Sequence, residues 1–138
     1  MNMRATVSAV LTALLFAGEC MADSGLALSG RFEYRTDPTS LEMLGGLVCF
    51  YPSAESAQLL PRAQTDKRLA WFCFTNDMES KKLLDIPREA KEGSCGYRGE
   101  AAVQVTKYTP HAGEGDGFDT AILQAVSNIS QPRTLPCE

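Results

Sequence analysis

The sequence has little of what most enzymes need at a catalytic centre. It contains a single histidine, His111, in a glycine-rich stretch where a fixed catalytic geometry is hard to hold. There is no G-x-S-x-G motif, and no phosphate-binding glycine loop leads into a helix with a lysine. The residues therefore predict a protein that is not an enzyme and that needs no cofactor.

Clusters of basic charge are also absent. The chain has 13 Lys and Arg against 17 Asp and Glu, a formal net charge of −4, and basic residues occur at most two in a row. Proteins that bind nucleic acid usually carry a basic patch or stripe, because contacts with phosphates supply most of the affinity. We therefore do not expect nucleic acid as a partner.

Only the N-terminus contains a long apolar run. Residues 1–4 are short and basic, residues 5–17 are apolar, and small residues for cleavage follow at 20–22. This order is typical of a secretory signal peptide, so residues 1–22 are predicted to be removed. Lipidation of Cys20 is the alternative, but Glu19 stands where that pathway needs a small residue.

The rest of the chain, residues 23–138, is predicted to form one soluble domain. No stretch within it approaches the roughly 20 apolar residues that cross a bilayer as a helix, so no membrane insertion is expected. A domain of this size buries about two-thirds of the surface that its unfolded chain exposes. The predicted location is periplasmic or secreted.

Residues 23–138 contain four cysteines, Cys49, Cys73, Cys95 and Cys137. An even number in a small exported domain indicates two disulfides, and the lack of a C-x-x-C motif argues against a redox or metal site. We expect the pairs Cys73–Cys95 and Cys49–Cys137, since the second would tie the C-terminal tail to an early strand. Pairing of Cys49 with Cys73, on neighbouring strands, is the main competitor. No metal ligands are predicted.

The clearest secondary-structure signal is a hairpin in the last third of the chain. Residues 97–108 alternate between apolar and polar side chains, as a half-buried strand does. Residues 118–129 are more continuously apolar, and their β-branched side chains favour a strand over a helix there. The connecting residues 109–117 hold three glycines and a proline. Their spacing does not match a calcium-binding loop, so a solvated connection is expected.

Three further strands are expected before the hairpin, at residues 26–35, 47–51 and 69–75. In the last of these, Phe72 and Phe74 are expected to enter the core, with Trp71 and Cys73 on the other face. Short helices are expected after capping residues, with the caps at Ser40, at Ser53, and at Asn76 or Asp77 before residues 78–84.

Five strands with a short helix between the third and the fourth predict an all-β fold. The element order resembles a small five-stranded barrel of the oligonucleotide/oligosaccharide-binding (OB) type, here stapled by disulfides. A two-sheet β-sandwich made of the same strands is the alternative. The tail, residues 130–138, is expected to be docked on the domain because it carries Cys137.

Aromatic side chains are the candidate ligand-binding residues. OB domains hold bases and sugars by stacking them on the barrel surface, and Trp71, Tyr51 and Tyr34 are the residues assigned to such a face. Core packing is the more common role for aromatic residues in a domain of this size. An acid–base pair of Glu100 and Asp119 across the hairpin is a further candidate, but both carboxylates are interpreted as facing solvent at strand ends.

Two functional hypotheses follow. The first is a non-catalytic interaction protein that binds another envelope or secreted protein. The alternative is a small-ligand module that holds an oligosaccharide or oligonucleotide on an aromatic face of the barrel. The small size, the disulfides and the lack of catalytic groups favour the first. The sequence does not predict the oligomeric state, nor whether the glycosylation motif at Asn128 is used.

Overall fold

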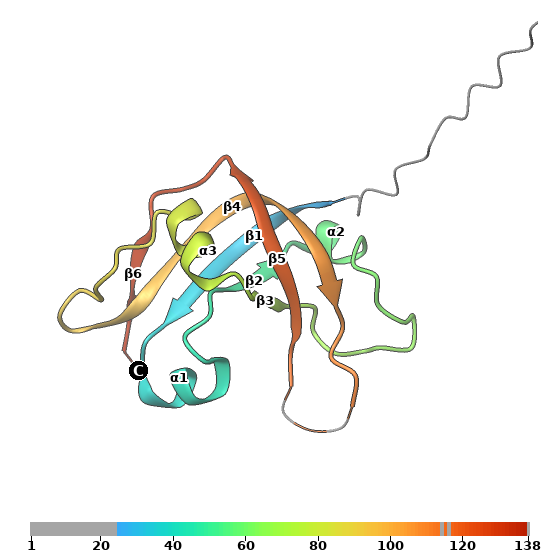
Figure 1. Ribbon diagram of the computed structural model, residues 1–138, viewed down its shortest axis with the longest axis horizontal. Coiled ribbons are helices and arrows are strands. Elements are labelled where there is room, and N and C mark those ends of the chain that lie inside the picture. The colour runs from blue at the N-terminus through green and yellow to red at the C-terminus, as the bar shows by residue number, and fades with distance from the viewer. Residues whose placement is uncertain (1–24, 114, 116, 138) are drawn as a thin grey trace, which may run out of the picture.

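The structure, a computed structural model, describes residues 25–113, 115 and 117–137. The predicted signal peptide, residues 1–22, lies outside the described residues. Along the chain the elements are β1 (Leu26–Arg35), α1 (Pro38–Leu44), β2 (Cys49–Pro52), α2 (Ala54–Ala57), β3 (Phe72–Phe74), α3 (Asp77–Leu83), β4 (Ser94–Thr109), β5 (Asp119–Ser127) and β6 (Arg133–Pro136) (Figure 1).

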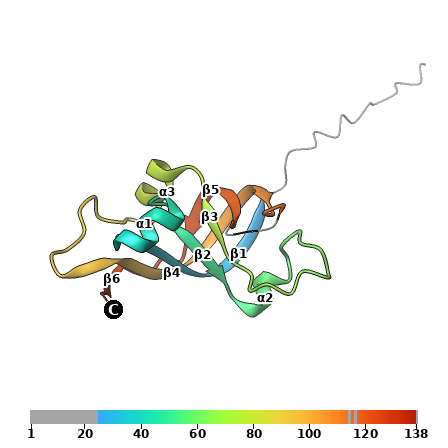
Figure 2. The same ribbon diagram turned by 90° about the horizontal axis from the view of Figure 1, so that it is seen from below.

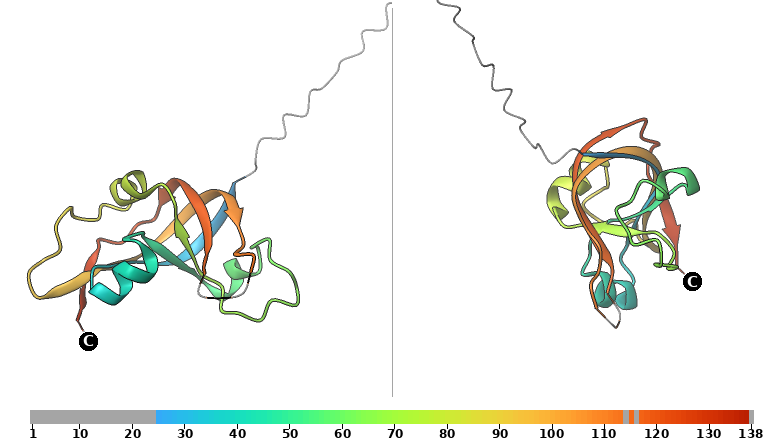
Figure 3. Two further views of the ribbon diagram at one scale, coloured as in Figure 1. Left: turned by 60° about the horizontal axis from the view of Figure 1, so that its bottom comes forward. Right: turned by 90° about the vertical axis from the view of Figure 1, so that its right-hand side faces the viewer.

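Five of these strands close into a barrel. They are hydrogen-bonded in the order β1-β2-β3-β5-β4, and β4 pairs in turn with β1, which completes the ring. The β3–β5 pair is parallel, and the other pairs of the ring are antiparallel. The right-hand view of Figure 3 shows the strands around their common core. The predicted five-stranded barrel with a helix between its third and fourth strands is confirmed, and the sandwich alternative is wrong.

The C-terminal tail adds a sixth strand outside the ring. In the antiparallel pair of β6 with the first part of β4, Ser94 lies opposite Pro136 and Arg98 opposite Arg133. Figure 2 shows β6 at the opposite end of the molecule from α2. Pro132 precedes this short edge strand and Pro136 ends it. Neither proline has an N–H that could donate a hydrogen bond to a further strand. The prediction of a docked tail is confirmed.

The core is built from phenylalanines on the inward side of the strands. Phe32, Phe50, Phe72 and Phe74 have no exposed surface, and the last three pack with ring centroids 5.6–6.1 Å apart. The prediction that Phe72 and Phe74 enter the core is confirmed. Because successive strand residues point to opposite sides, their neighbours in β2 and β3 lie on the outside of the barrel.

Glycines allow the strands to cross closely. A Cβ on Gly30 of β1 would stand 2.3 Å from the Tyr51 carbonyl oxygen of β2, so only glycine fits this crossing. Gly96 near the start of β4 has a φ of +125°, and a Cβ there would stand 1.8 Å from the Tyr34 carbonyl oxygen. Strands in a closed five-stranded ring must bend while they stay paired. Glycine allows this at both positions.

β4 and β5 form the predicted hairpin, and the helical alternative for residues 118–129 is wrong. The register shifts twice along this pair, at β-bulges: the extra residue lies in β5 opposite the step from Gln104 to Val105, and in β4 between Thr106 and Thr109. Such bulges increase the local bend and twist of the strand. They let β4 pair with β1 on one side and β5 on the other.

One of the predicted helix caps lies at a different residue, and another lies at the predicted residue but makes no side-chain cap hydrogen bond. Asp37, not Ser40, caps α1 by accepting a hydrogen bond from the Ser40 N–H (3.1 Å), because Pro38 already begins the helix. Ser53 caps α2 as predicted. The Asn76 side chain makes no cap hydrogen bond at α3; instead its amide bonds the N–H (3.0 Å) and the carbonyl (2.8 Å) of Leu123, which anchors the start of α3 to β5.

The disulfides are Cys49–Cys73 and Cys95–Cys137, so the expected pairing was wrong and the competitor Cys49–Cys73 is confirmed. Cys49 and Cys73 lie directly opposite each other on β2 and β3, with Cα atoms 3.8 Å apart. Cys137 follows β6, which brings it beside Cys95 of β4, with Cα atoms 4.9 Å apart. The tail therefore docks on the start of β4 and not on an early strand.

Candidate functional site

The outer surface of the barrel carries a row of stacked side chains from β1, β2 and the residues directly before β3 and β5. The register places Arg31 of β1 opposite Tyr51 of β2. Trp71 and Phe118 come directly before the register pair Phe72–Asp119 of β3 and β5. These four side chains thus lie next to one another around the barrel. We call Tyr51, Trp71 and Phe118 the aromatic row, with Arg31 at one end.

The rings of the aromatic row are nearly parallel. Tyr51 and Trp71 have centroids 6.0 Å apart and ring planes 17° apart, and Trp71 and Phe118 have centroids 5.8 Å apart and planes 27° apart. The Arg31 guanidinium lies 4.8 Å from the centroid of the Tyr51 ring. Stacked rings and a cation over a ring face are favourable arrangements. Trp71, between its two neighbours, therefore turns its ring faces towards other rings.

The aromatic row borders a shallow groove of about 650 Å³. Tyr51, Pro52, Leu69 and Ala70 form the part of its wall nearest the row, and Glu100 to Ala102 of β4 form another part. Leu69 is 78% exposed, whereas Tyr51 and Trp71 are half-buried. Burial raises the pKa of Tyr51, and the nearby Glu33 carboxylate raises it further.

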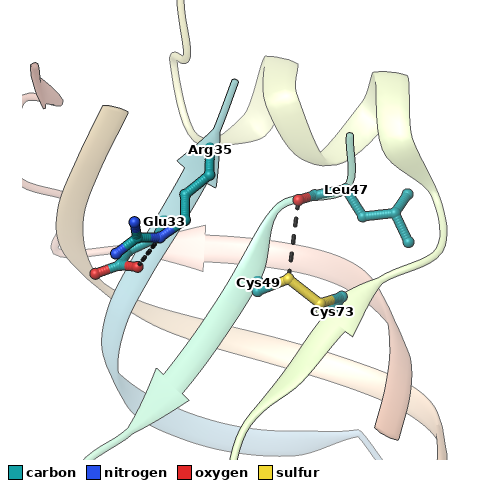
Figure 4. The surroundings of a disulfide bond; sticks show 5 residues. All are labelled: Glu33, Arg35, Leu47, Cys49 and Cys73. Carbon is teal, nitrogen blue, oxygen red and sulfur yellow. Dashed lines mark hydrogen bonds and ion pairs between the residues drawn. A yellow bond between two sulfur atoms is a disulfide. The ribbon is translucent and has the colours of Figure 1, made fainter. Parts of the chain in front are cut away.

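A second row of outward side chains runs beside the first. Glu33 of β1 lies opposite Cys49 of β2, and Cys49 opposite Cys73 of β3. Figure 4 shows the disulfide across β2 and β3 and the Glu33–Arg35 contact on β1. The Glu33 carboxylate is only 9% exposed and lies between Arg31 (3.3 Å) and Arg35 (3.1 Å). Both arginines are thereby held in place on the surface.

The segment that leads into β3 is fixed by a network of ion pairs. Asp66 binds Arg62 (2.9 Å) and Arg68 (2.7 Å), and both arginines also approach the buried Asp119 at 3.5 and 3.6 Å. Asp119, at the start of β5, is 3% exposed. Hydrogen bonds to the side chain and main chain of Arg68 hold the pKa of Asp66 far below its usual range. This network holds the segment next to Trp71 on the barrel.

Asp119 also accepts hydrogen bonds from the Tyr108 hydroxyl and, at 2.7 Å, from the His111 main-chain N–H. Burial, the hydrogen bond to Asp119 and the charge of Asp119 all raise the pKa of Tyr108 well above its usual value. The Tyr108 ring packs edge-on against Phe72, with centroids 5.3 Å apart. The buried carboxylate therefore ties the hairpin loop, the segment before β3 and the core together.

The raised pKa of Tyr108 predicts a pH effect at the alkaline end. The neutral phenol stabilises the fold fully up to its unfolded pKa of about 10, and this stabilisation is lost as the pH rises through the folded pKa. We expect the Tyr108 contribution to absorbance at 295 nm, obtained by subtracting a titration of Tyr108→Phe, to appear well above pH 10. A contribution that titrates at pH 10 in the folded protein would contradict the hydrogen bond to Asp119.

The structure brings together two of the three predicted ligand-binding residues. Tyr51 and Trp71 stack on each other on the outer surface. Tyr34 lies two residues after Phe32 on the inward side of β1 and packs against the core. The Lys81 ammonium lies 4.4 Å from the centroid of its ring. The three predicted residues therefore do not form one face.

The interpretation of Glu100 and Asp119 was right for one carboxylate and wrong for the other. Glu100 is exposed and binds Arg133 at 3.0 Å. Asp119 is buried, and Arg62 from the segment between β2 and β3 lies 3.5 Å from its carboxylate. Each carboxylate has its own partners, and no contact joins the two into an acid–base pair among the described residues.

Phe118 and Arg31 were missed at the sequence level. Phe118 precedes β5 and lies next to Trp71 only because β3 and β5 are parallel neighbours. The alternation along β1 shows from the sequence that Arg31 points outwards. The ring that it contacts, Tyr51, follows from the pairing of β1 with β2. A register prediction would have found both residues.

Other kinds of site receive no support from the side chains that the structure describes. Within them, no group of three or more His, Cys, Asp or Glu residues is arranged to hold a metal ion. The Nε2 atom of His111 is buried and has no hydrogen-bond partner in that part of the chain. No helix over the described ranges is both long and apolar enough to cross a membrane.

The fold and its surface define the protein as a disulfide-bonded barrel with OB-type strand order and an outward row of aromatic side chains. Comparison of the chain with protein-family models, with curated proteins and with solved structures gave no match. Its function is therefore argued from the geometry alone.

Proposed function

We propose that this protein is an exported, non-catalytic binding protein that holds another envelope or secreted protein against the outer surface of β1, β2 and β3. The observation that carries the proposal is the aromatic row with Arg31 at its end. The same region, the surface of the second and third strands, is where OB barrels hold their ligands. Two disulfides are compatible with an oxidising compartment outside the cytoplasm.

The orientation of the rings favours a protein partner over a base or a sugar. A base or sugar ring stacks on a free aromatic face, but the faces of Trp71 are turned towards Tyr51 and Phe118. The groove beside them adds the 78% exposed Leu69. Aromatic residues and arginine, together with apolar side chains, are the groups that dominate the centres of protein interfaces.

A matched pair of surface variants tests this proposal. Leu69 lies beside the aromatic row, whereas Met78, 86% exposed, lies on α3 away from it. Each is replaced by aspartate, which is well solvated at both exposed positions. The wild-type domain, Leu69→Asp and Met78→Asp are immobilised with their disulfides intact and used to capture proteins from an envelope extract of the organism that encodes the chain.

We expect wild type and Met78→Asp to retain the same protein in stoichiometric amount, and Leu69→Asp to retain at least about tenfold less, as for a residue at the centre of an interface. The proposal fails if no protein is retained, or if both variants retain it equally. Quenching of Trp71, the only tryptophan, by a neutral oligosaccharide would instead support the small-ligand hypothesis.

A further inference from the structure

Four of the described arginines lie on the neighbouring strands β1, β4 and β6, and two lie in the segment before β3. Arg31 and Arg35 have the outward parity of β1, Arg98 lies opposite Glu33 in β4, and Arg133 lies opposite Arg98 in β6. Arg62 and Arg68 hold the segment beside Trp71. We call these six residues the arginine surface. The remaining described arginine, Arg88, lies next to α3 with Met78 and Lys82.

On the arginine surface most positive groups are more exposed than the carboxylates that they contact, although Arg62 is only 11% exposed. The Arg31 and Arg68 side chains are each 50% exposed, whereas those of their partners Glu33, Asp66 and Asp119 are 9%, 15% and 3% exposed. Glu100 is the exception, at 55% exposure beside Arg133. A protein with a formal net charge of −4 thus presents a locally positive surface next to its aromatic row.

We propose that the segment of the partner bound at the aromatic row is acidic, with separate Asp or Glu carboxylates that bind Arg31 and Arg98 and with an apolar side chain in the groove beside Leu69. This inference rests on the function proposed above. A guanidinium forms charge-assisted, often bidentate hydrogen bonds with carboxylates, and Arg31 is already oriented by Glu33 and Tyr51. The local positive charge also speeds the encounter with an acidic partner.

The pattern of charges favours an acidic polypeptide over a polyanion such as nucleic acid. Phosphates are spaced closely and regularly along a nucleic acid chain. On the arginine surface, the exposed Glu100 lies beside Arg133 and opposite Arg31, so an evenly charged strand would meet a negative group there. A polypeptide that carries a few separate carboxylates avoids this repulsion.

Defined polymers of known charge test the proposal in place of the natural partner. The mature domain is titrated with a random Glu–Tyr copolymer (4:1), a random Lys–Tyr copolymer, heparin and a (dT)15 oligonucleotide. The emission of Trp71 reports binding at the row, and amide NMR shifts report the location. Arg31→Gln and Arg98→Gln remove one charge each from the arginine surface, and Arg88→Gln removes the same charge beside α3 as the matched control.

We expect the Glu–Tyr copolymer to change Trp71 emission, with amide shifts in β1 and β2 and little response to the Lys–Tyr copolymer. Arg31→Gln should weaken binding about tenfold and Arg98→Gln several-fold, whereas Arg88→Gln should bind as the wild type does. Binding should also weaken as salt rises from low to high concentration, because the charges are partly exposed.

The proposal is overturned if the Glu–Tyr copolymer does not bind, if the Lys–Tyr copolymer binds equally well, or if Arg88→Gln weakens binding as much as the other two variants. Binding of heparin or (dT)15 at least tenfold tighter than the Glu–Tyr copolymer would assign the surface to a different polyanion. A captured partner that depends on Leu69 but not on Arg31, Arg98 or salt would leave the proposed function standing and refute this inference alone.

Discussion

Replacing Cys49 and Cys73 together by alanine is expected to lower the free energy of unfolding by about 3–4 kcal/mol. The disulfide closes a loop with a sequence separation of 24 residues, and removing it increases the freedom of the unfolded chain. It also joins β2 to β3, which share only two register pairs, Cys49–Cys73 and Phe50–Phe72. Urea denaturation of the purified double variant, followed by circular dichroism, measures the loss.

The second disulfide provides the matched control. Cys95 and Cys137 have a sequence separation of 42 residues, so their joint replacement should cost a similar free energy. It lies at the junction of β4 and β6, away from the aromatic row. Only the Cys49–Cys73 variant should therefore shift the emission of Trp71 towards that of an exposed indole. Equal shifts in both double variants would show that the β2–β3 disulfide has no special role in holding the row.

Asp119→Asn is expected to lower the free energy of unfolding by about 3 kcal/mol. The substitution keeps the side-chain size but removes a buried negative charge that faces Arg62 and accepts hydrogen bonds from Tyr108 and the His111 main chain. Arg62, only 11% exposed, would keep Asp66 as its sole carboxylate partner within the network. Urea denaturation at neutral pH measures the change.

Glu100→Gln is the control for this variant, because it removes a carboxylate whose pair with Arg133 is more than half exposed on both sides. Solvent screens such a pair, so the free energy of unfolding should stay nearly unchanged. If Asp119→Asn were as harmless as Glu100→Gln, the network would not hold the segment before β3. Faster proteolysis within residues 58–70 of Asp119→Asn would independently show that the segment has been released.

The candidate binding surface and the core are built from the same strands. Phe50 of β2 and Phe72 of β3 point inwards, while Tyr51 of β2 and Trp71, just before β3, point outwards and stack. The inner packing fixes the strand positions, and the strand positions fix the stack. This explains why a rigid aromatic row can be held on a domain of this size.

The charge pattern of the arginine surface lets the effect of a substitution on binding affinity be measured apart from its effect on the free energy of unfolding. Arg31 and Arg35 share the carboxylate of Glu33, so each charge is oriented before a partner arrives. A preoriented side chain loses less conformational freedom on binding. Variants of exposed arginines should therefore change binding more than they change the free energy of unfolding.

The sequence by itself determined the local features of this protein. Alternation with a period of two predicted β1, β4 and the inward positions of Phe72 and Phe74. Cap and helix signals predicted α2 and α3, and the number of cysteines predicted two disulfides. These features depend on a few neighbouring residues, or on composition, and can therefore be recognised without knowing the fold.

Only the tertiary structure decided which distant residues meet. The partners of Cys49, Cys95 and Trp71 follow from strand register, and register depends on how the whole ring closes and bends. The environment of Asp119 depends on Arg62, which comes from the segment between β2 and β3. Local sequence patterns carry no information on such pairings, because the interactions that select them join residues far apart along the chain.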